Sequence, residues 1–169
     1  MINLYIDFDG VIMNTIEIGY KMMDEMDIER NYNNASEFYR NLDWKNFLNN
    51  KCSQINNSIE CIQKIIDSNL FNVNILSHVT CLNEAIAKIE YIRQYFKDIT
   101  FIPVPKDISK TKMVHTQDAI LIDDYAGNLR EWATSGGIGV RFNLENEDKG
   151  FITIDRLDKI IDIDFTKTS

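Results

Sequence analysis

Two carboxylates lie one residue apart at the end of the first apolar run of the chain. The run 2–6 is almost continuously apolar, and Asp7, Phe8, Asp9 and Gly10 follow it. Such a run predicts a strand that is buried on both faces of a parallel sheet. Carboxylates at the carboxyl end of a central parallel strand lie where open α/β sheets bind their ligands. An Asp-Gly pair after a strand is also an ordinary turn, so this stretch alone leaves a structural and a catalytic interpretation open.

Polar side chains also follow other predicted strands of the chain. The residues at these strand ends, together with a lysine that precedes the last of them, are Ser77, His78, Lys110, Asp123 and Asp124. Right-handed crossovers place the carboxyl ends of parallel strands at one edge of a sheet. We therefore expect these side chains to converge with Asp7 and Asp9.

The side chains in this set are suited to phosphoryl chemistry. Carboxylates that lie together repel one another unless a cation neutralises them, and oxygen ligands favour a hard divalent ion such as Mg²⁺. A hydroxyl and an ammonium nearby suit the peripheral oxygens of a phosphate. One carboxylate can then attack phosphorus, and the resulting aspartyl-phosphate divides one difficult displacement into two easier ones. The metal would neutralise charge and hold the reacting groups in line.

Strands alternate with helices along the part of the chain that carries these residues. The apolar runs predict strands over 2–6, 72–78, 100–104, 119–122 and 139–142. A helix over 82–96 is marked by apolar positions, with Arg93 as the exception: Leu82, Ala85, Ile86, Ile89 and Phe96. Further helices are expected over 111–116, 127–135 and 155–163. Strands separated by helices indicate a Rossmann-like α/β fold, a doubly wound parallel sheet of about five strands.

The segment between the first two predicted strands has a helical pattern and no convincing strand. Isoleucines at positions 55, 59, 62 and 66 recur at helical spacing, and Ser36 is a candidate N-cap of an earlier helix. We interpret 14–70 as a small helical cap inserted after the first strand, and 1–13 with 71–169 as the α/β core. A cap of this size can close over a small phosphomonoester and exclude water, but it hinders access by a phosphoprotein or a duplex.

In order and in placement, the polar residues resemble the four motifs of the haloacid dehalogenase (HAD) superfamily. The matching residues are Asp7-Phe8-Asp9-Gly10-Val11-Ile12, Ser77, Lys110 and Asp123-Asp124. The resemblance implies that Asp7 is the nucleophile and that Asp9 protonates the leaving group and then activates water. It also implies that Ser77 and Lys110 clamp the phosphate and its charge. A second carboxylate at position 9 marks the phosphatases and mutases of the superfamily, whereas its dehalogenases lack it and its ion-pumping ATPases carry threonine there.

The resemblance also implies a magnesium site. Mg²⁺ would be held by Asp7, the backbone carbonyl of Asp9 and Asp123, with Asp124 a ligand directly or through water. For substrate binding we expect a phosphate pocket whose members are Gly10, Ser77, His78 and Lys110. Lys106 competes with Lys110 for the role of phosphate lysine, although Lys110 directly precedes the helix that leads to the Asp-Asp strand.

The region of the last motif narrows the expected substrate. Residues 120–129, with Trp132 and Gly136-Gly137, are similar to the fourth-motif region of the HAD-type 5′-nucleotidases that act on deoxyribonucleotides. This similarity implies a (deoxy)nucleoside 5′-monophosphate, and the alternative is a sugar phosphate or another small phosphomonoester. Two alternatives belong to other classes, namely a phosphoacceptor switch like a response-regulator receiver and a non-catalytic binding protein. In a receiver, however, the lysine comes last and no cap intervenes.

Composition and charge limit the partners. The chain has 169 residues, of which 44% are hydrophobic and 26% charged, as in a soluble protein of one domain. Its net charge of −8 argues against a nucleic acid polymer as partner. We find no apolar run long enough for a membrane span, no basic leader and no CxxC pair among three cysteines. We therefore expect a cytoplasmic monomer or homodimer that acts on a small phosphorylated substrate, without a membrane partner.

Overall fold

A computed structural model describes residues 1–167 and contains one six-stranded sheet. Its strands are β1 (Ile2–Ile6), β2 (Phe71–Val79), β3 (Thr100–Pro105), β4 (Ile120–Asp123), β5 (Ile138–Phe142) and β6 (Ile152–Ile154). The spatial order is β3-β2-β1-β4-β5-β6, and every pairing is parallel. The Rossmann-like α/β class is confirmed, with six strands where the sequence predicts about five. The additional strand, β6, has only three residues and lies at the edge of the sheet.

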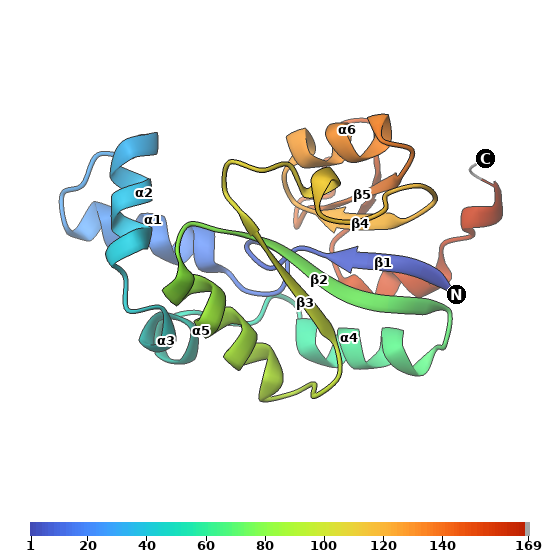
Figure 1. The fold of residues 1–169 in the computed structure, drawn as a ribbon, viewed down its shortest axis with the longest axis horizontal. Helices are drawn as coiled ribbons and strands as arrows, with labels where there is room; N and C mark the ends of the chain where they lie inside the picture. Colours follow the sequence, from blue (N-terminus) through green and yellow to red (C-terminus); the bar gives the residue numbers. More distant parts are fainter. Residues whose placement is uncertain (168–169) are drawn as a thin grey trace.

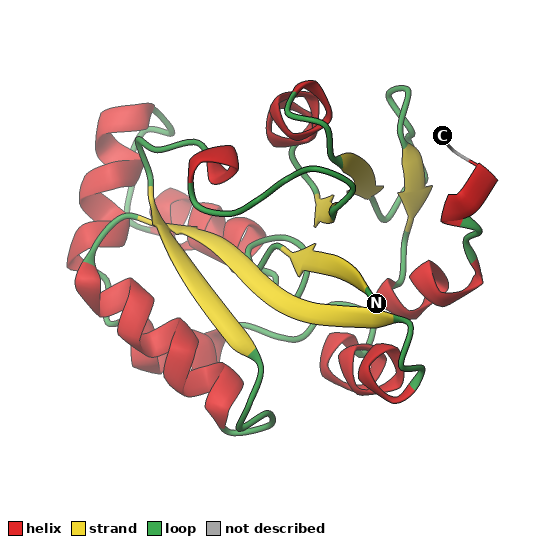
Figure 2. Cartoon of the chain, turned by 45° about the vertical axis from the view of Figure 1, so that its right-hand side comes forward, coloured by secondary structure: helices red, strands yellow, loops and turns green. Residues whose placement is uncertain are grey.

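Alternate residues of the central strands face two separate hydrophobic layers. Leu4 and Ile6 of β1 belong to the larger layer, which includes residues of α4 (Ser58–Asp67), α5 (Leu82–Arg93) and the 3-10 helix η3 (Leu157–Asp162). Tyr5 points to the opposite face, where it meets Trp132 of α6 (Ala126–Thr134) edge to face at 5.5 Å. Figure 2 shows helices on both sides of the sheet. The sheet is therefore buried on both faces, as the apolar strands predict.

The helices between β1 and β2 divide into two groups. The first group is α1 (Thr15–Glu25), α2 (Tyr32–Asn41), α3 (Trp44–Asn46) and the π-helix η1 (Phe47–Lys51). α1 and α2 lie beyond the carboxyl end of β1 (Figure 1). α4 packs on the sheet instead, with Cys61, Ile62 and Ile65 fully buried in the larger layer. The domain boundary at residue 70 stays a prediction, but this packing favours a cap that ends before α4.

The chain enters and leaves the cap at one place. Residues 12–14 and 53–55 run side by side, with Met13 in an antiparallel bridge to Gln54. The Asn14 N–H donates to the Ser53 carbonyl at 3.1 Å, and a second bond at 2.9 Å joins residues 55 and 12. The cap is thus attached to the core through a hydrogen-bonded neck.

Several helix ends differ from the sequence-based expectation. Asn31 caps α2, because its side chain accepts a hydrogen bond from the Asn34 N–H at 2.9 Å. The prediction of Ser36 as the N-cap is therefore wrong. The helix expected over 111–116 is a single 3-10 turn, η2 (Lys110–Lys112), and the one over 155–163 is η3. A further 3-10 turn is η4 (Phe165–Lys167). Within residues 1–167, no helix has both the length and the apolar character that crossing a membrane requires.

Candidate active site

Three carboxylates meet where the strand order of the sheet reverses. This reversal lies between β1 and β4, the position at which open α/β sheets bind ligands. Asp7 directly follows β1, and Asp123 is the last residue of β4. One oxygen of each of Asp7, Asp123 and Asp124 lies within 4.8 Å of the others. The two strands therefore hold side chains together that are far apart in the sequence.

Gly10 makes room for this carboxylate group. Its φ of +74° is in the left-handed region that glycine adopts readily. A Cβ at this position would lie 2.4 Å from a carboxylate oxygen of Asp124. Glycine is thus required for both the turn and the close approach of Asp124, while contact between Gly10 and a substrate stays a prediction.

Lys110 is the lysine that reaches the carboxylates. Its Nζ donates to Asp7 Oδ1 at 2.8 Å and to Asp123 Oδ2 at 2.7 Å. Burial alone would lower the pKa of Lys110, but the charges of Asp123 and Asp7 outweigh it and raise this pKa above its usual range. Lys106 lines a neighbouring cavity instead. Of the two lysines that the sequence leaves open, Lys110 is the one positioned between the strand ends.

The group carries more negative charge than one lysine neutralises. Burial, and then repulsion from Asp123, raises the pKa of Asp7 to about 7. Burial, together with the charges of Asp7 and Asp123, raises the pKa of Asp124 to about 9. Protons or a divalent cation would relieve this repulsion. Because the donors are carboxylate oxygens, the group fits a hard cation such as Mg²⁺.

The side chain of Asp9 is not part of this three-carboxylate group. Its Oδ1 accepts a hydrogen bond from the Thr15 hydroxyl at 2.6 Å, and its Oδ2 accepts one from Lys88 Nζ at 2.7 Å. Thr15 is the first residue of α1, so the bond joins Asp9 to the start of the cap. Metal ligation by the backbone carbonyl of Asp9 stays a prediction.

Lys88 is a site residue that the sequence-based reasoning missed. Its side chain is fully buried, and its Nζ donates to Asp9 at 2.7 Å and to Glu84 at 2.5 Å. The same Nζ donates to Ser77 Oγ and to the His78 carbonyl, both at 3.2 Å. Burial would lower the pKa of Lys88, but the charges of Asp9 and Glu84 raise it above the ordinary value. Lys88 therefore joins the polar residues of β2 to Asp9.

Ser77 and His78 both lie near the carboxyl end of β2, as expected from the sequence. Ser77 is fully buried, and its hydroxyl donates to the His78 carbonyl at 3.2 Å. His78 Nε2 is hydrogen-bonded to the Ile108 carbonyl at 2.8 Å. Burial lowers the pKa of His78, which favours the neutral imidazole. A neutral ring that donates to a carbonyl positions the loop after β3 rather than supplying charge.

Solved HAD-superfamily hydrolases have the same fold. One from Ehrlichia chaffeensis superposes with a TM-score of 0.60 at 11% identity, over 95% of this chain and 94% of that chain. A HAD phosphatase from Thermococcus onnurineus has a TM-score of 0.60 at 15% identity, over 95% of this chain and 96% of that chain. A HAD-superfamily hydrolase from Geobacter sulfurreducens has a TM-score of 0.61 at 13% identity, over 96% of this chain and 99% of that chain. The chain has the HAD hydrolase fold. No protein-family model and no curated protein sequence matches it.

A small cavity of about 180 Å³ opens beside Asp9, between the cap and the core of this HAD-like fold. The cap contributes Tyr39 and Trp44 to its wall, and the core contributes His78 and Lys106. The rings of Tyr39 and Trp44 are stacked, with centroids 5.7 Å apart. Among the cavities of the described residues, this is the one lined by Asp9 and His78, so it is the candidate ligand-binding cavity.

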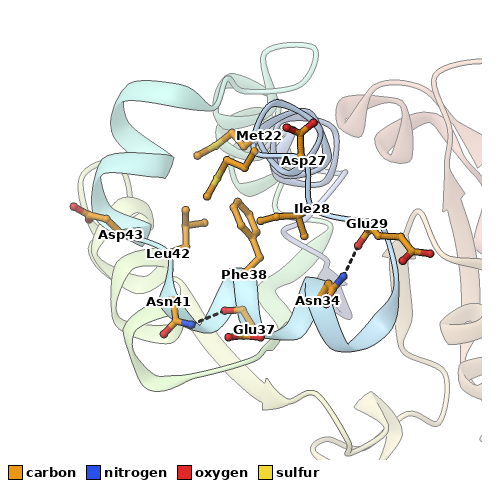
Figure 3. Close-up of a pocket in the computed structure, with 11 residues that line it drawn as sticks. Met22, Asp27, Ile28, Glu29, Asn34, Glu37, Phe38, Asn41, Leu42 and Asp43 are labelled. Carbon is orange, nitrogen blue, oxygen red and sulfur yellow. Dashed lines mark hydrogen bonds between the residues drawn. The ribbon is translucent and has the colours of Figure 1, made fainter.

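A larger cavity of about 700 Å³ lies within the cap (Figure 3). Met22, Ile28, Phe38 and Leu42 point into it from α1, α2 and their connections. None of the three clustered carboxylates lines this cavity. Size alone therefore does not identify the candidate active site.

Proposed function

We propose that this chain is a Mg²⁺-dependent HAD phosphatase that hydrolyses a small phosphomonoester through an aspartyl-phosphate on Asp7. The observation that carries the proposal is the group of Asp7, Asp123 and Asp124 within 4.8 Å, with Lys110 bonded to two of them. The HAD hydrolase fold supports the same class of reaction. This arrangement offers a nucleophile and a cation site at the same strand ends.

The metal would be held by Asp7, Asp123, Asp124 and the backbone carbonyl of Asp9. When bound, it would neutralise the negative charge that gathers between these carboxylates and a phosphoryl group. Lys110 would lower the pKa of Asp7 against the burial that raises it, because the ammonium lies 2.8 Å from Asp7 Oδ1. Together with the cation, Lys110 would make Asp7 available as a nucleophile at neutral pH.

Each of the remaining polar residues has a distinct proposed part in the reaction. Asp9 would give a proton to the leaving oxygen and then take one from the attacking water, assistance that is typically worth about 10²–10⁴-fold. The hydroxyl of Ser77, which donates to the His78 carbonyl, would turn toward a phosphate oxygen. Phosphate binding by Ser77, His78 and Lys110 is part of this proposal.

The preferred substrate in this proposal is a (deoxy)nucleoside 5′-monophosphate. The ring of Tyr39, which lines the cavity and is partly exposed, supports it, because an aromatic face can stack on a base. The volume of the cavity supports the alternative, a sugar phosphate. A volume of about 180 Å³ is below the range of about 300–1,000 Å³ that is common for sites that bury drug-sized ligands. A nucleotide would therefore need the cap to move outward.

The test is phosphate release from a panel of ribo- and deoxyribonucleoside monophosphates and sugar phosphates, with Mg²⁺ and with EDTA. We expect release that needs Mg²⁺ and is fastest on one compound class. Equal, poor rates on all nucleotides would contradict the nucleotidase preference and leave the phosphatase proposal standing. Absence of Mg²⁺-dependent release from every compound would contradict the phosphatase proposal and favour a non-catalytic binding protein.

A further inference from the structure

We propose that Lys88 is a positioning residue that orients the carboxylate of Asp9 for proton transfer to the leaving group. The inference rests on the proposed phosphatase function and deepens it. The ammonium of Lys88 contacts oxygens from three segments: Asp9 after β1, Ser77 and His78 in β2, and Glu84 on its own helix. One buried cation therefore fixes the proposed proton donor and the proposed phosphate-binding hydroxyl relative to each other.

The surroundings of Lys88 keep its ammonium in place. The rings of Phe8 and Trp44 lie over it, each with its centroid 5.2 Å from Nζ. Glu84 is held in turn, because its second carboxylate oxygen accepts a hydrogen bond from the Thr80 N–H at 2.8 Å. The Lys88–Glu84 pair is thus connected to the loop that follows β2. Because the ammonium of Lys88 has so many fixed partners, it does not move with the Asp9 side chain. A rotation of Asp9 would therefore break their hydrogen bond.

α5 buries the Lys88–Glu84 pair while some of its own apolar side chains stay exposed. Leu82 is 72% exposed and Ile86 is 46% exposed, whereas Lys88 and Glu84 are 0% and 3% exposed. Burying a charged pair costs desolvation energy that a hydrophobic pair would not. The same side of α5 buries Tyr91 and Ile92, which are 5% and 0% exposed, so this cost is met inside an otherwise apolar interface. The compensating contacts of the buried charges are those with Asp9 and the residues of β2.

The contacts assign different parts to the two oxygens of Asp9. Lys88 holds Oδ2 with a buried ammonium, whereas Oδ1 accepts, among the described residues, only from the Thr15 hydroxyl, so Oδ1 is the oxygen that exchanges the proton. In the first step the Asp7 oxygen–phosphorus bond forms, the bond from phosphorus to the leaving oxygen breaks, and the proton on Asp9 passes to that oxygen. In the second step a water oxygen bonds to phosphorus and Asp7 leaves as carboxylate. Asp9 then receives a proton from the water, and inorganic phosphate is released.

The test compares two substrates of similar shape with different leaving groups, in the presence of Mg²⁺. Phenyl phosphate releases phenol, which needs a proton, whereas p-nitrophenyl phosphate releases a more acidic phenol that needs it far less. kcat/KM reports the step up to the first irreversible phosphoryl transfer. We expect Lys88→Met to lower kcat/KM for phenyl phosphate at least about 10-fold more than for p-nitrophenyl phosphate, because proton transfer contributes about 10²–10⁴-fold.

Three further variants separate orientation from folding. Lys88→Met leaves Glu84 buried without its partner, so the double variant Lys88→Met/Glu84→Gln removes both charges and should show the same difference between substrates. Glu84→Gln alone keeps the Lys88–Asp9 contact and should show a smaller difference. Lys64→Met, at a half-exposed lysine of α4, should behave as wild type. Thermal unfolding verifies that each variant is folded.

Two outcomes would overturn the inference while the phosphatase function stands. One is an equal loss, or no loss, on both substrates in a folded Lys88 variant. The other is failure of both Lys88 variants to fold, which would make the role of Lys88 structural. If wild type releases phosphate from neither compound with Mg²⁺, the proposed function fails and the inference fails with it.

Discussion

The backbone of Gly10 approaches the carboxylate of Asp124 so closely that a Cβ at position 10 would lie 2.4 Å from one of its oxygens. Gly10→Ala should therefore displace Asp124 and remove Mg²⁺-dependent activity. The left-handed backbone adds a strain of roughly 1–2 kcal/mol. Gly150→Ala is a matched control, because Gly150 has a φ of +88° but a Cβ added there would meet no atom within 4 Å. We expect both variants to lose stability in thermal unfolding, and only Gly10→Ala to lose activity. Equal activity in the two would contradict the role given to this contact.

Asp7→Asn should abolish phosphate release and leave the protein folded. The amide cannot form the aspartyl-phosphate, but it has nearly the size of the carboxylate and occupies the same place after β1. Phosphate release and circular dichroism measure the two properties. Asp148→Asn, at an exposed loop residue, provides the control for a lost surface charge. Full activity in Asp7→Asn would refute the assignment of the nucleophile.

Lys110 and Lys106 should differ in the kinetic constant that they affect. Lys110 contacts Asp7 and Asp123, so Lys110→Met should lower kcat by about 10²-fold or more, as the loss of a charge-stabilising donor typically does. Lys106 lines the cavity beside Asp9, so Lys106→Met should mainly raise KM. Steady-state kinetics on the best substrate of the panel measures both. The opposite pattern would make Lys106 the phosphate lysine.

The metal-free protein should lose stability as the pH rises from about 7 to about 9. Folding raises the pKa of Asp7 to about 7 and that of Asp124 to about 9, whereas an unfolded aspartate has a pKa of about 3.9. The folded state therefore binds more protons than the unfolded state below these values, and its stability falls as the pH rises through the window. Most of the loss of stability that is due to Asp7 is complete near pH 7. The further loss of stability above pH 7 is therefore due mainly to Asp124.

Thermal unfolding in EDTA at several pH values measures this effect. Mg²⁺ should raise the melting temperature more at pH 8.5 than at pH 6, because it replaces the protons that the carboxylates lose. Asp124→Asn should flatten the dependence in EDTA. A melting temperature in EDTA that stays constant or rises between pH 7 and 9 would contradict the proposed crowding of the carboxylates.

The elements that carry the motifs could be predicted because each depends on local sequence. An almost continuous apolar run such as 2–6 or 119–122 specifies a buried strand, and the polar residue after it marks the edge of the sheet. The structure brings Asp7, Asp123 and Asp124 together as these strand ends predict. β6 was not predicted, because a strand of three residues is too short to show a periodic pattern in the sequence.

The buried face of α5 could not be predicted from periodicity. Of the predicted apolar positions, Ala85 and Phe96 are buried but Leu82 and Ile86 are exposed, and the structure also buries Glu84, Lys88 and Ile92. Both sets of residues recur every three or four positions. The buried side packs in the larger hydrophobic layer and, through Lys88, contacts Asp9, and the local pattern includes neither partner. The spacing of Glu84 and Lys88, four residues apart, was the available signal for an ion pair.

The neck formed by 12–14 and 53–55 has a consequence for how this architecture can change. Because the insert departs and rejoins at one point, its helices can be lengthened, shortened or exchanged without displacing any strand. The stretch around Trp44 covers Lys88 and packs on the core, so it is the part of the insert that such changes would have to keep. The segment that borders the cavity beside Asp9 can thus be replaced while the strand ends that carry Asp7 and Asp123 stay in place.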